Sequence, residues 1–470
     1  RCQRYGNASI PVEIHVLPFT VPSRPTFEVS LNTYGSPARA SGLDPVSDKG
    51  LEAELQYHRL AHTHRCTLTP LGYSHSGTIE SGYAPVLDDS GAQRRVSSWS
   101  NWDTRFMQYI TGEAFRGLPR SGQPISHIYL PFHEAWPEDI RRHYAYVPPT
   151  ANYPQIIADH AMLAGPIEQM FSQAYIEGYR AVLRAFSDHL RHAGPSPTRA
   201  HFYLNNKYYY RDPANGGRGT SWWLLDEPMH RDDWLALAWY GRLLKTAIGT
   251  SRTSGRPDGQ NERRASGTVQ DQSRIIFRAD ISRPQWQRDY LDGVVDLMAV
   301  NDELFQRPTL MRRLKQRLGA EIWHYGEAPA PHRPLSEFES WPLRAYLAGA
   351  NGIVPWQSVG SVSNTERAEA TALIVPARPN DTEPLATLRL KALARGAQTA
   401  ELANALARKR GWTRGQMRIA LSEVMASGDG EALRAALRDA LARQARRPSQ
   451  SAHRSGQTDT GRPDPPRPKP

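Results

Sequence analysis

The chain has 470 residues and a formal net charge of +11 at pH 7, and 39% of its residues are hydrophobic. No stretch approaches the 18 consecutive apolar residues of a membrane-spanning helix, so the composition excludes a membrane span. Six Lys/Arg against two Asp fall in the Pro-rich stretch 445–470, and the other arginines are scattered without a nucleic-acid recognition motif. Specific binding of nucleic acid is therefore not expected.

Eight short β-rich segments recur along the chain, with helical patterns such as residues 167–190 between them. Several are apolar on both faces, as buried parallel strands are. They span residues 26–34, 66–73, 126–132, 200–205, 274–281, 294–300, 321–327 and 352–357. This alternation predicts an α/β fold with a (β/α)8 TIM-type barrel. An open doubly wound sheet is the alternative, but no Gly-rich phosphate loop follows the first strand.

The composition changes along the chain predict where the barrel ends. Residues 1–24 resemble the end of a preceding β-domain followed by a Pro-rich connector, and the barrel is expected over 25–383. A polar Gly/Ser-rich insertion at 249–272 is expected to be mobile. Residues 384–444 predict a C-terminal helical segment, and 445–470 a disordered basic tail. Because the chain begins without methionine, we expect a processed protein that is secreted or periplasmic, with a cytoplasmic location left open.

The stretch SWWLLDEP, residues 221–228, places two adjacent carboxylates, Asp226 and Glu227, between an apolar run and a proline. Two acids at the end of an apolar run indicate either a solvated turn or a catalytic pair. A second Asp-Glu pair, at 302–303, is assigned to the charge preference of a helix N-terminus. Asp226 and Glu227 are therefore the candidate catalytic residues.

Other polar and aromatic residues follow the predicted strands, and in a (β/α)8 barrel the C-terminal strand ends carry the chemistry. Carboxylates, amides and aromatic faces that converge at one barrel mouth are typical of a sugar site, and glycoside cleavage commonly needs two carboxyl groups. The candidate substrate-binding residues are His133, Glu134, Asn205, Tyr208, Asp280, Asn301, Trp323, Tyr325 and Trp356.

Four stretches together resemble the barrel domain of the glycoside hydrolase family 123-like proteins, many of which are classed as domain of unknown function 4091. The resemblance covers roughly residues 10–405, in the same order. It departs at 399–401, where the family has an Asp-Tyr-Glu-like triplet and this chain has Thr-Ala-Glu, which puts the packing or capping role of that segment in question. The stretches are SWWLLDEP, RADISRPQWQRDYLDGVVDLMAVN, GEAP and SWPLRAYLAGANGIVPWQ.

The resemblance implies retaining hydrolysis of a β-linked 2-acetamido-2-deoxy sugar, such as N-acetylgalactosamine, assisted by the acetamido group of the substrate. Glu227 would be the general acid/base, and Asp226 would hold the acetamido nitrogen. Successive residues of an extended chain point apart, and mutual repulsion would raise one pKa of the pair. Tyr325 or Tyr208 would orient the acetamido group. Trp356 or Trp323 would form the floor under the sugar ring.

Two other functions stay open. One is a glycosidase of a different sugar with Glu134 and Glu227 as an ordinary two-carboxylate pair. The other is a non-catalytic carbohydrate-binding barrel, which a salt bridge to Asp226 or Glu227 would favour. No cofactor is expected.

No metal site is expected either. His58 and His62 have a spacing that metal sites use, but they precede the second strand, at the non-catalytic end of the barrel. Two cysteines, Cys2 and Cys66, are too few for a disulfide framework or a cysteine metal site. Trp222 and Trp223 are assigned to packing rather than to sugar binding.

Overall fold

The structure is a computed structural model, and parts of the chain are outside its description. The expected insertion at 249–272 lies outside the described residues except for residue 249, and the expected tail at 445–470 except for residue 445. Cys2 and most of residues 1–24 lie outside them as well. Tyr208 lies outside them too. The structure describes residues 11, 16 and 20–445 except for 74–76, 145–166, 168–170, 208, 210–213, 215–221, 250–273, 362, 364–365 and 423–429.

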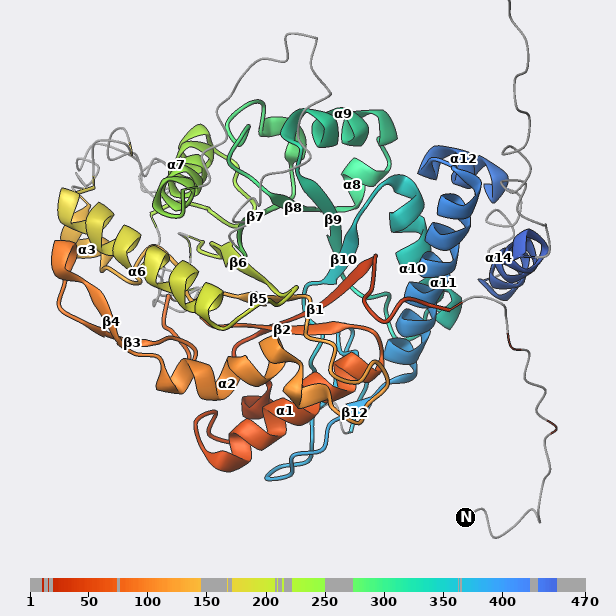
Figure 1. Ribbon diagram of the computed structural model, residues 1–470, viewed down its shortest axis with the longest axis horizontal. Helices are drawn as coiled ribbons and strands as arrows, with labels where there is room; N and C mark the ends of the chain where they lie inside the picture. The colour runs from red at the N-terminus through yellow and green to blue at the C-terminus, as the bar shows by residue number, and fades with distance from the viewer. Residues whose placement is uncertain are drawn as a thin grey trace, which may run out of the picture.

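Eight parallel strands form the centre of the molecule, and helices surround them (Figure 1). Each strand pairs with its neighbours in chain order. Between the two end strands, the hydroxyl groups of Thr67 and Ser126 lie 2.7 Å apart, so the sheet is nearly closed. The predicted (β/α)8 barrel is confirmed. The strands are β1 Glu28–Tyr34, β2 Thr67–Leu71, β5 His127–Tyr129, β6 Arg199–Tyr203, β7 Ile275–Ile281, β8 Leu297–Val300, β9 Glu321–Gly326 and β10 Gly352–Pro355.

Amphipathic helices cover the outside of the sheet. In α6, for example, the side chain of Ser172 accepts the N–H of Tyr175 at 3.3 Å and so caps the first turn. Its apolar face, from Tyr175 to Leu190, is buried against the barrel. No helix among the described residues has the length and apolar character to cross a bilayer. The helices around the barrel are α1 Asp48–Thr63, α2 Ser100–Thr111, α3 Ile140–His143, α6 Gln173–His192, α7 Arg231–Ala247, α8 Asp302–Phe305, α9 Pro308–Leu318 and α10 Leu335–Ala348.

Two short antiparallel pairs lie outside the barrel sheet. One pairs β3 (Val86–Asp88) with β4 (Arg95–Ser98), and the other pairs β11 (Ile374–Val375) with β12 (Leu385–Ala386). Neither contributes a side chain to the lining of the cavity described below.

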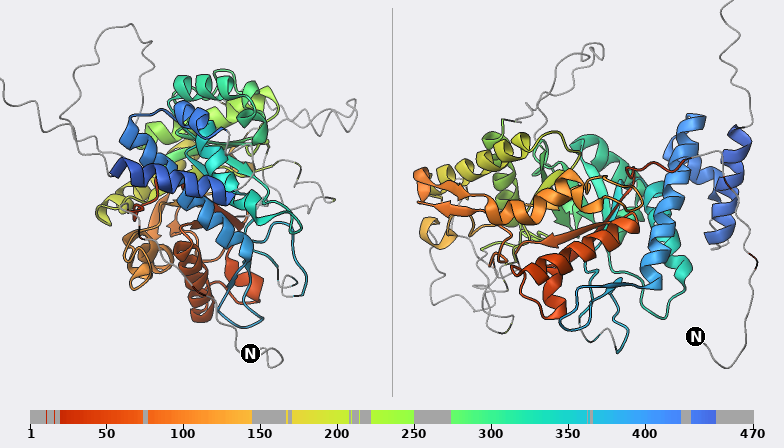
Figure 2. Two further views of the ribbon diagram at one scale, coloured as in Figure 1. Left: turned by 90° about the vertical axis from the view of Figure 1, so that its right-hand side faces the viewer. Right: turned by 60° about the horizontal axis from the view of Figure 1, so that its bottom comes forward.

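Three helices, α11 (Leu388–Arg410), α12 (Arg414–Ala420) and α14 (Gly430–Ala445), lie together on one side of the barrel, where α11 packs against α10 (Figures 1 and 2). The buried carboxylate of Glu401 in α11 accepts the N–H groups of Thr26 at 2.5 Å and Phe27 at 3.2 Å. It thereby fastens the chain just before β1 to the C-terminal helices. The segment that departs from the family triplet at 399–401 therefore retains a structural role through this glutamate.

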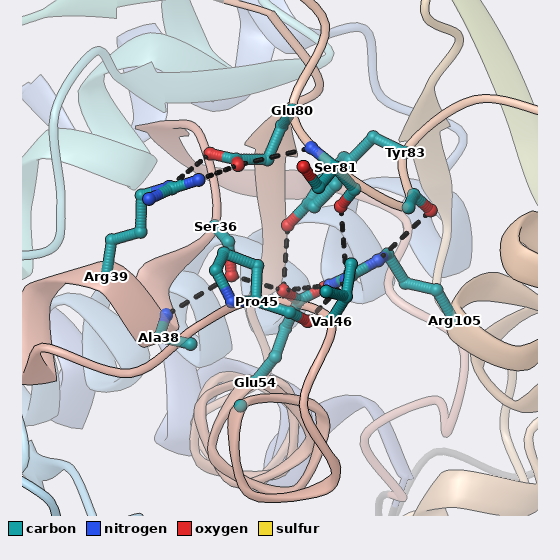
Figure 3. Close-up of polar contacts among 12 residues, drawn as sticks. Ser36, Ala38, Arg39, Pro45, Val46, Glu54, Glu80, Ser81, Tyr83 and Arg105 are labelled. Carbon is teal, nitrogen blue, oxygen red and sulfur yellow. Dashed lines mark hydrogen bonds and ion pairs between the residues drawn. The ribbon is translucent and has the colours of Figure 1, made fainter.

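A buried ion pair joins two outer helices to the loops that follow β1 and β2 (Figure 3). Arg105 of α2 contacts Glu54 of α1 at 2.5 Å, and both side chains are at most 1% exposed. The same carboxylate accepts hydrogen bonds from Ser36 at 2.6 Å and Tyr83 at 2.8 Å. Because Ser36 and Tyr83 follow barrel strands, this network holds the mouth loops of β1 and β2 in place.

We predict that Arg105→Met destabilises the protein by about 3–5 kcal/mol, because it leaves the charge of Glu54 buried without its cation. Arg116→Met is the matched control, since Arg116 pairs with Glu113 on the surface, where an ion pair contributes less than about 1 kcal/mol. Urea denaturation of both variants measures the difference. Equal losses in the two variants would contradict the role given to the buried pair.

Candidate active site

A cavity of about 390 Å³ opens at the C-terminal ends of the barrel strands and contains both predicted acids. A larger cavity, of about 540 Å³, lies beside the start of β7 and has no carboxylate in its lining. Because functional side chains of (β/α)8 barrels gather at the C-terminal end, the smaller cavity is the candidate site. Its lining residues are Asn32, Tyr34, Tyr203, Lys207, Asp226, Glu227, Arg278, Asp280, Tyr325, Gly326, Glu327, Val354 and Trp356.

The backbone of the loop before α7 brings the two acids to the same side. The N–H of Asp226 donates to the carbonyl of Asn206 at 3.3 Å, and the N–H of Glu227 donates to that of Asp280 at 3.0 Å. Glu227 has a φ of +61°, in the left-handed region that residues other than glycine seldom adopt. The chain is thus not extended at this point. The expectation that the two carboxylates point apart is wrong.

Both carboxylates instead converge on the ammonium group of Lys207. Its Nζ lies 3.0 Å from Asp226 Oδ2 and 3.1 Å from Glu227 Oε2. Asp226 also accepts a hydrogen bond from the hydroxyl of Tyr203 at 3.2 Å, and Glu227 accepts one from the hydroxyl of Tyr325. Each acid therefore has one phenol of its own and shares one cation with the other.

The two acids differ in burial, and their pKa values move in opposite directions. Burial raises the pKa of Asp226 to about 6, because Lys207 offsets the lost hydration only in part and Asp280 and Glu227 add repulsion. Burial also acts to raise the pKa of Glu227, but Lys207 and the hydrogen bond from Tyr325 outweigh it and lower that pKa. The raised pKa of the pair therefore belongs to Asp226 and not to Glu227, to which the resemblance assigns the acid role.

Asp280 lines the cavity as a structural acid. Arg278, which is buried in the barrel, donates from Nε and Nη2 to its two carboxylate oxygens, both at 2.7 Å. The same guanidinium donates to the hydroxyl of Tyr129 at 2.6 Å and lies 4.8 Å from the ring centre of Tyr203. Such a two-point ion pair fixes the orientation of the Asp280 carboxylate.

An aromatic wall bounds the cavity on the side of β1 and β10. The rings of Tyr34 and Trp356 have centroids 6.3 Å apart. The carbonyl of Trp356 accepts a hydrogen bond from Asn32 at 2.7 Å, which fixes the start of its loop against β1. Aromatic faces of this kind suit the apolar face of a sugar ring.

The cavity brings together part of the predicted set. Tyr208 is outside the described residues. Asn301 lies at the N-cap of α8 and is not part of the lining. The predicted residues that do line the cavity are Asp226, Glu227, Asp280, Tyr325 and Trp356.

Four of the predicted substrate-binding residues are fully buried and do not line the cavity: His133, Glu134, Asn205 and Trp323. Trp323 faces the barrel interior one layer below Tyr325, since residues two apart on a strand face the same side. An ordinary catalytic pair of Glu134 and Glu227 would need both carboxylates in the cavity. Glu134 is buried outside it, so the structure does not support that pair. His133 packs its ring 4.8 Å from that of Tyr73.

Packing also accounts for the other residues that were considered for function. The rings of His58 and His62 stack on Tyr109 at 4.0 Å and on Phe115 at 4.1 Å. Within the described parts of the chain, no group of three His, Cys, Asp or Glu residues is arranged to hold a metal ion. Trp223 is buried, as its assignment to packing predicts.

Several residues of the site are not in the set predicted from the sequence. Lys207 was recognisable as a charged residue just after β6, and Arg278 as a charge inside β7, two residues before Asp280. Tyr34 and Tyr203 carry no such signal, because tyrosine is an ordinary strand residue. Their place at the mouth follows only from where β1 and β6 end.

We predict that Asp226→Asn is more stable than the wild type at pH 8 and that the difference disappears below about pH 4. The folded protein holds a proton at Asp226 more tightly than the unfolded chain, so ionisation costs stability as the pH rises from 3.8 to about 6. This difference in the pKa of Asp226 corresponds to a loss of about 3 kcal/mol in the free energy of unfolding. Urea denaturation at pH 4, 6 and 8 measures it, with Asp188→Asn, at an exposed ion pair, as control. A wild type more stable than Asp226→Asn at pH 8 would contradict the prediction.

No protein-family model matches this chain, and no curated protein sequence matches it. The assignment of function therefore depends on the geometry of the cavity and on the resemblance of the motifs that surround it.

Proposed function

We propose that the protein is a glycoside hydrolase and that Asp226 and Glu227 are its catalytic residues. The observation that carries this proposal is that two adjacent carboxylates line one cavity at the barrel mouth and converge on one ammonium group, that of Lys207. Glycoside cleavage commonly uses two carboxyl groups in one site. The cavity volume of about 390 Å³ is in the range of small-molecule sites, and its wall includes Trp356 and Tyr34.

The proposed substrate is a β-linked 2-acetamido-2-deoxy sugar such as N-acetylgalactosamine, and the resemblance supports this part of the proposal. In the first step the acetamido carbonyl oxygen forms a bond to the anomeric carbon, and the glycosidic bond breaks as Glu227 protonates the leaving oxygen. The product is a cyclic oxazolinium ion, whose N–H donates to Asp226. In the second step Glu227 takes a proton from water, whose oxygen replaces the acetamido oxygen at the anomeric carbon.

The depth of the two acids fits these roles. The side chain of Glu227 is 34% exposed, whereas that of Asp226 is 9% exposed. The more exposed acid is the one able to reach a glycosidic oxygen at the entrance. The deeper acid faces the part of the cavity where a substituent on the sugar ring would lie.

A second candidate function is non-catalytic carbohydrate binding. The observation that favours it is the ion pair of Lys207 with both acids, because an acid held in a salt bridge is not available for proton transfer. The aromatic wall would serve a binding protein as well as an enzyme.

We expect the protein to release 4-nitrophenol from aryl β-N-acetylgalactosaminide or β-N-acetylglucosaminide. Glu227→Gln is expected to lower kcat/KM by about 10²–10⁴, because general acid/base catalysis contributes about that factor. Asp226→Asn should also be strongly impaired. Glu303→Gln, in the second Asp-Glu pair of the chain, is the matched control and should retain activity.

The same panel separates the alternatives. Activity on aryl glycosides without the acetamido group would contradict the role given to Asp226. Absence of hydrolysis across the panel, together with binding on a glycan array that Trp356→Ala abolishes, would support the carbohydrate-binding function instead.

A further inference from the structure

Lys207 occupies the centre of the candidate site. It follows β6, and its side chain is 13% exposed inside the cavity. Two of the three N–H donors of an ammonium group suffice for its contacts of 3.0 Å to Asp226 and 3.1 Å to Glu227. The positions between the two acids, where polar groups of a sugar would have to bind, are therefore taken by this ammonium group.

Other charged and titratable groups also act on the pair. Tyr325 donates a hydrogen bond to Glu227, and Arg283 acts electrostatically on the same carboxylate. Tyr203 donates to Asp226 at 3.2 Å, Asp280 acts electrostatically on Asp226, Tyr34 acts on Asp226 and Lys207, and Tyr209 acts on Lys207. Within the described parts of the chain, Lys207 is the cation that forms an ion pair with both acids. The charge balance of the pair thus depends on one side chain.

We propose that Lys207 is a positioning residue that clamps Asp226 and Glu227 in the free protein and withdraws from both acids when a sugar binds. The clamp itself follows from the two short contacts, whereas the withdrawal rests on the proposed function. A sugar acetamido N–H then takes the place of the ammonium at Asp226. Glu227, partly buried and no longer paired, takes a proton from solvent, which is the form that a general acid needs.

The ion pair of Lys207 with both acids, which favours a binding protein, is then compatible with an enzyme. The ion pair to Lys207 belongs to the free protein in this proposal, and loss of that pair converts Glu227 from a carboxylate to an acid. The flexible four-carbon stem of lysine makes such a movement possible without a change in the backbone.

The test is the titration of the Glu227 carboxyl carbon by ¹³C NMR in the free protein, with the resonance assigned by its absence in Glu227→Gln. Lys207→Met is expected to raise the pKa of Glu227 by about 1–3 pH units, the size of effect that an adjacent opposite charge has on a carboxyl group. Lys207→Arg restores the charge and should titrate nearly as the wild type does. Lys245→Met removes a partly buried Lys–Asp pair elsewhere, with Asp296, and should leave Glu227 unchanged.

An unchanged pKa of Glu227 in Lys207→Met would overturn the clamp. If that variant does not fold, Lys207→Gln provides the same measurement with a polar side chain. None of these titrations requires activity or a ligand, so they decide on the clamp even if the proposed function fails.

The withdrawal is tested by repeating the titration with N-acetylgalactosamine at saturation. The pKa of Glu227 is expected to rise in the wild type and to change little in Lys207→Met, where the ammonium group is already missing. Equal changes in both proteins would overturn the withdrawal. Failure of this sugar to bind would overturn the withdrawal together with the proposed substrate, while the result for the clamp would stand.

Discussion

One ammonium group holds the candidate site together. Asp226 and Glu227 are adjacent and largely removed from water, where two carboxylates repel each other strongly unless a cation lies between them. Lys207 supplies that cation, and the residue before it in the chain, Asn206, accepts the backbone N–H groups of Leu225 at 2.9 Å and Asp226 at 3.3 Å. The same short loop after β6 therefore fixes both the position of the acids and the charge that keeps them together.

This arrangement lowers the stability of the folded protein, and contacts with the barrel strand β7 hold it in place. Glu227 is held in a left-handed conformation, which strains a residue with a side chain, and Asp226 has a pKa raised by burial. Both features lower stability and persist because β7 restrains the loop: the carbonyl of Asp280 accepts the N–H of Glu227, and Arg278 fixes the side chain of Asp280. Local features that lower stability and are rigidly supported occur mostly at functional sites, which agrees with the proposed role of the two acids.

The fold could be predicted further than the site. Buried parallel strands are continuous apolar runs, so all eight were recognisable, and the rule of C-terminal strand ends located Asp226, Glu227 and Tyr325. The burial of each side chain was not predictable in the same way. Glu134, for example, follows a strand but lies buried under α6, where Tyr175 donates to its carbonyl. The left-handed backbone at Glu227 has no signal in a sequence without glycine at that position, so the convergence of both acids on Lys207 could not be foreseen.

The most direct test of the central claim is a crystal structure with a thiazoline analogue of N-acetylgalactosamine, which mimics the cyclic oxazolinium ion. We predict that the sugar ring lies in the cavity against Trp356, that the thiazoline nitrogen contacts Asp226, and that the Nζ of Lys207 has left Glu227. A thiazoline bound outside the cavity, or bound while Lys207 still contacts both acids, would contradict the proposal.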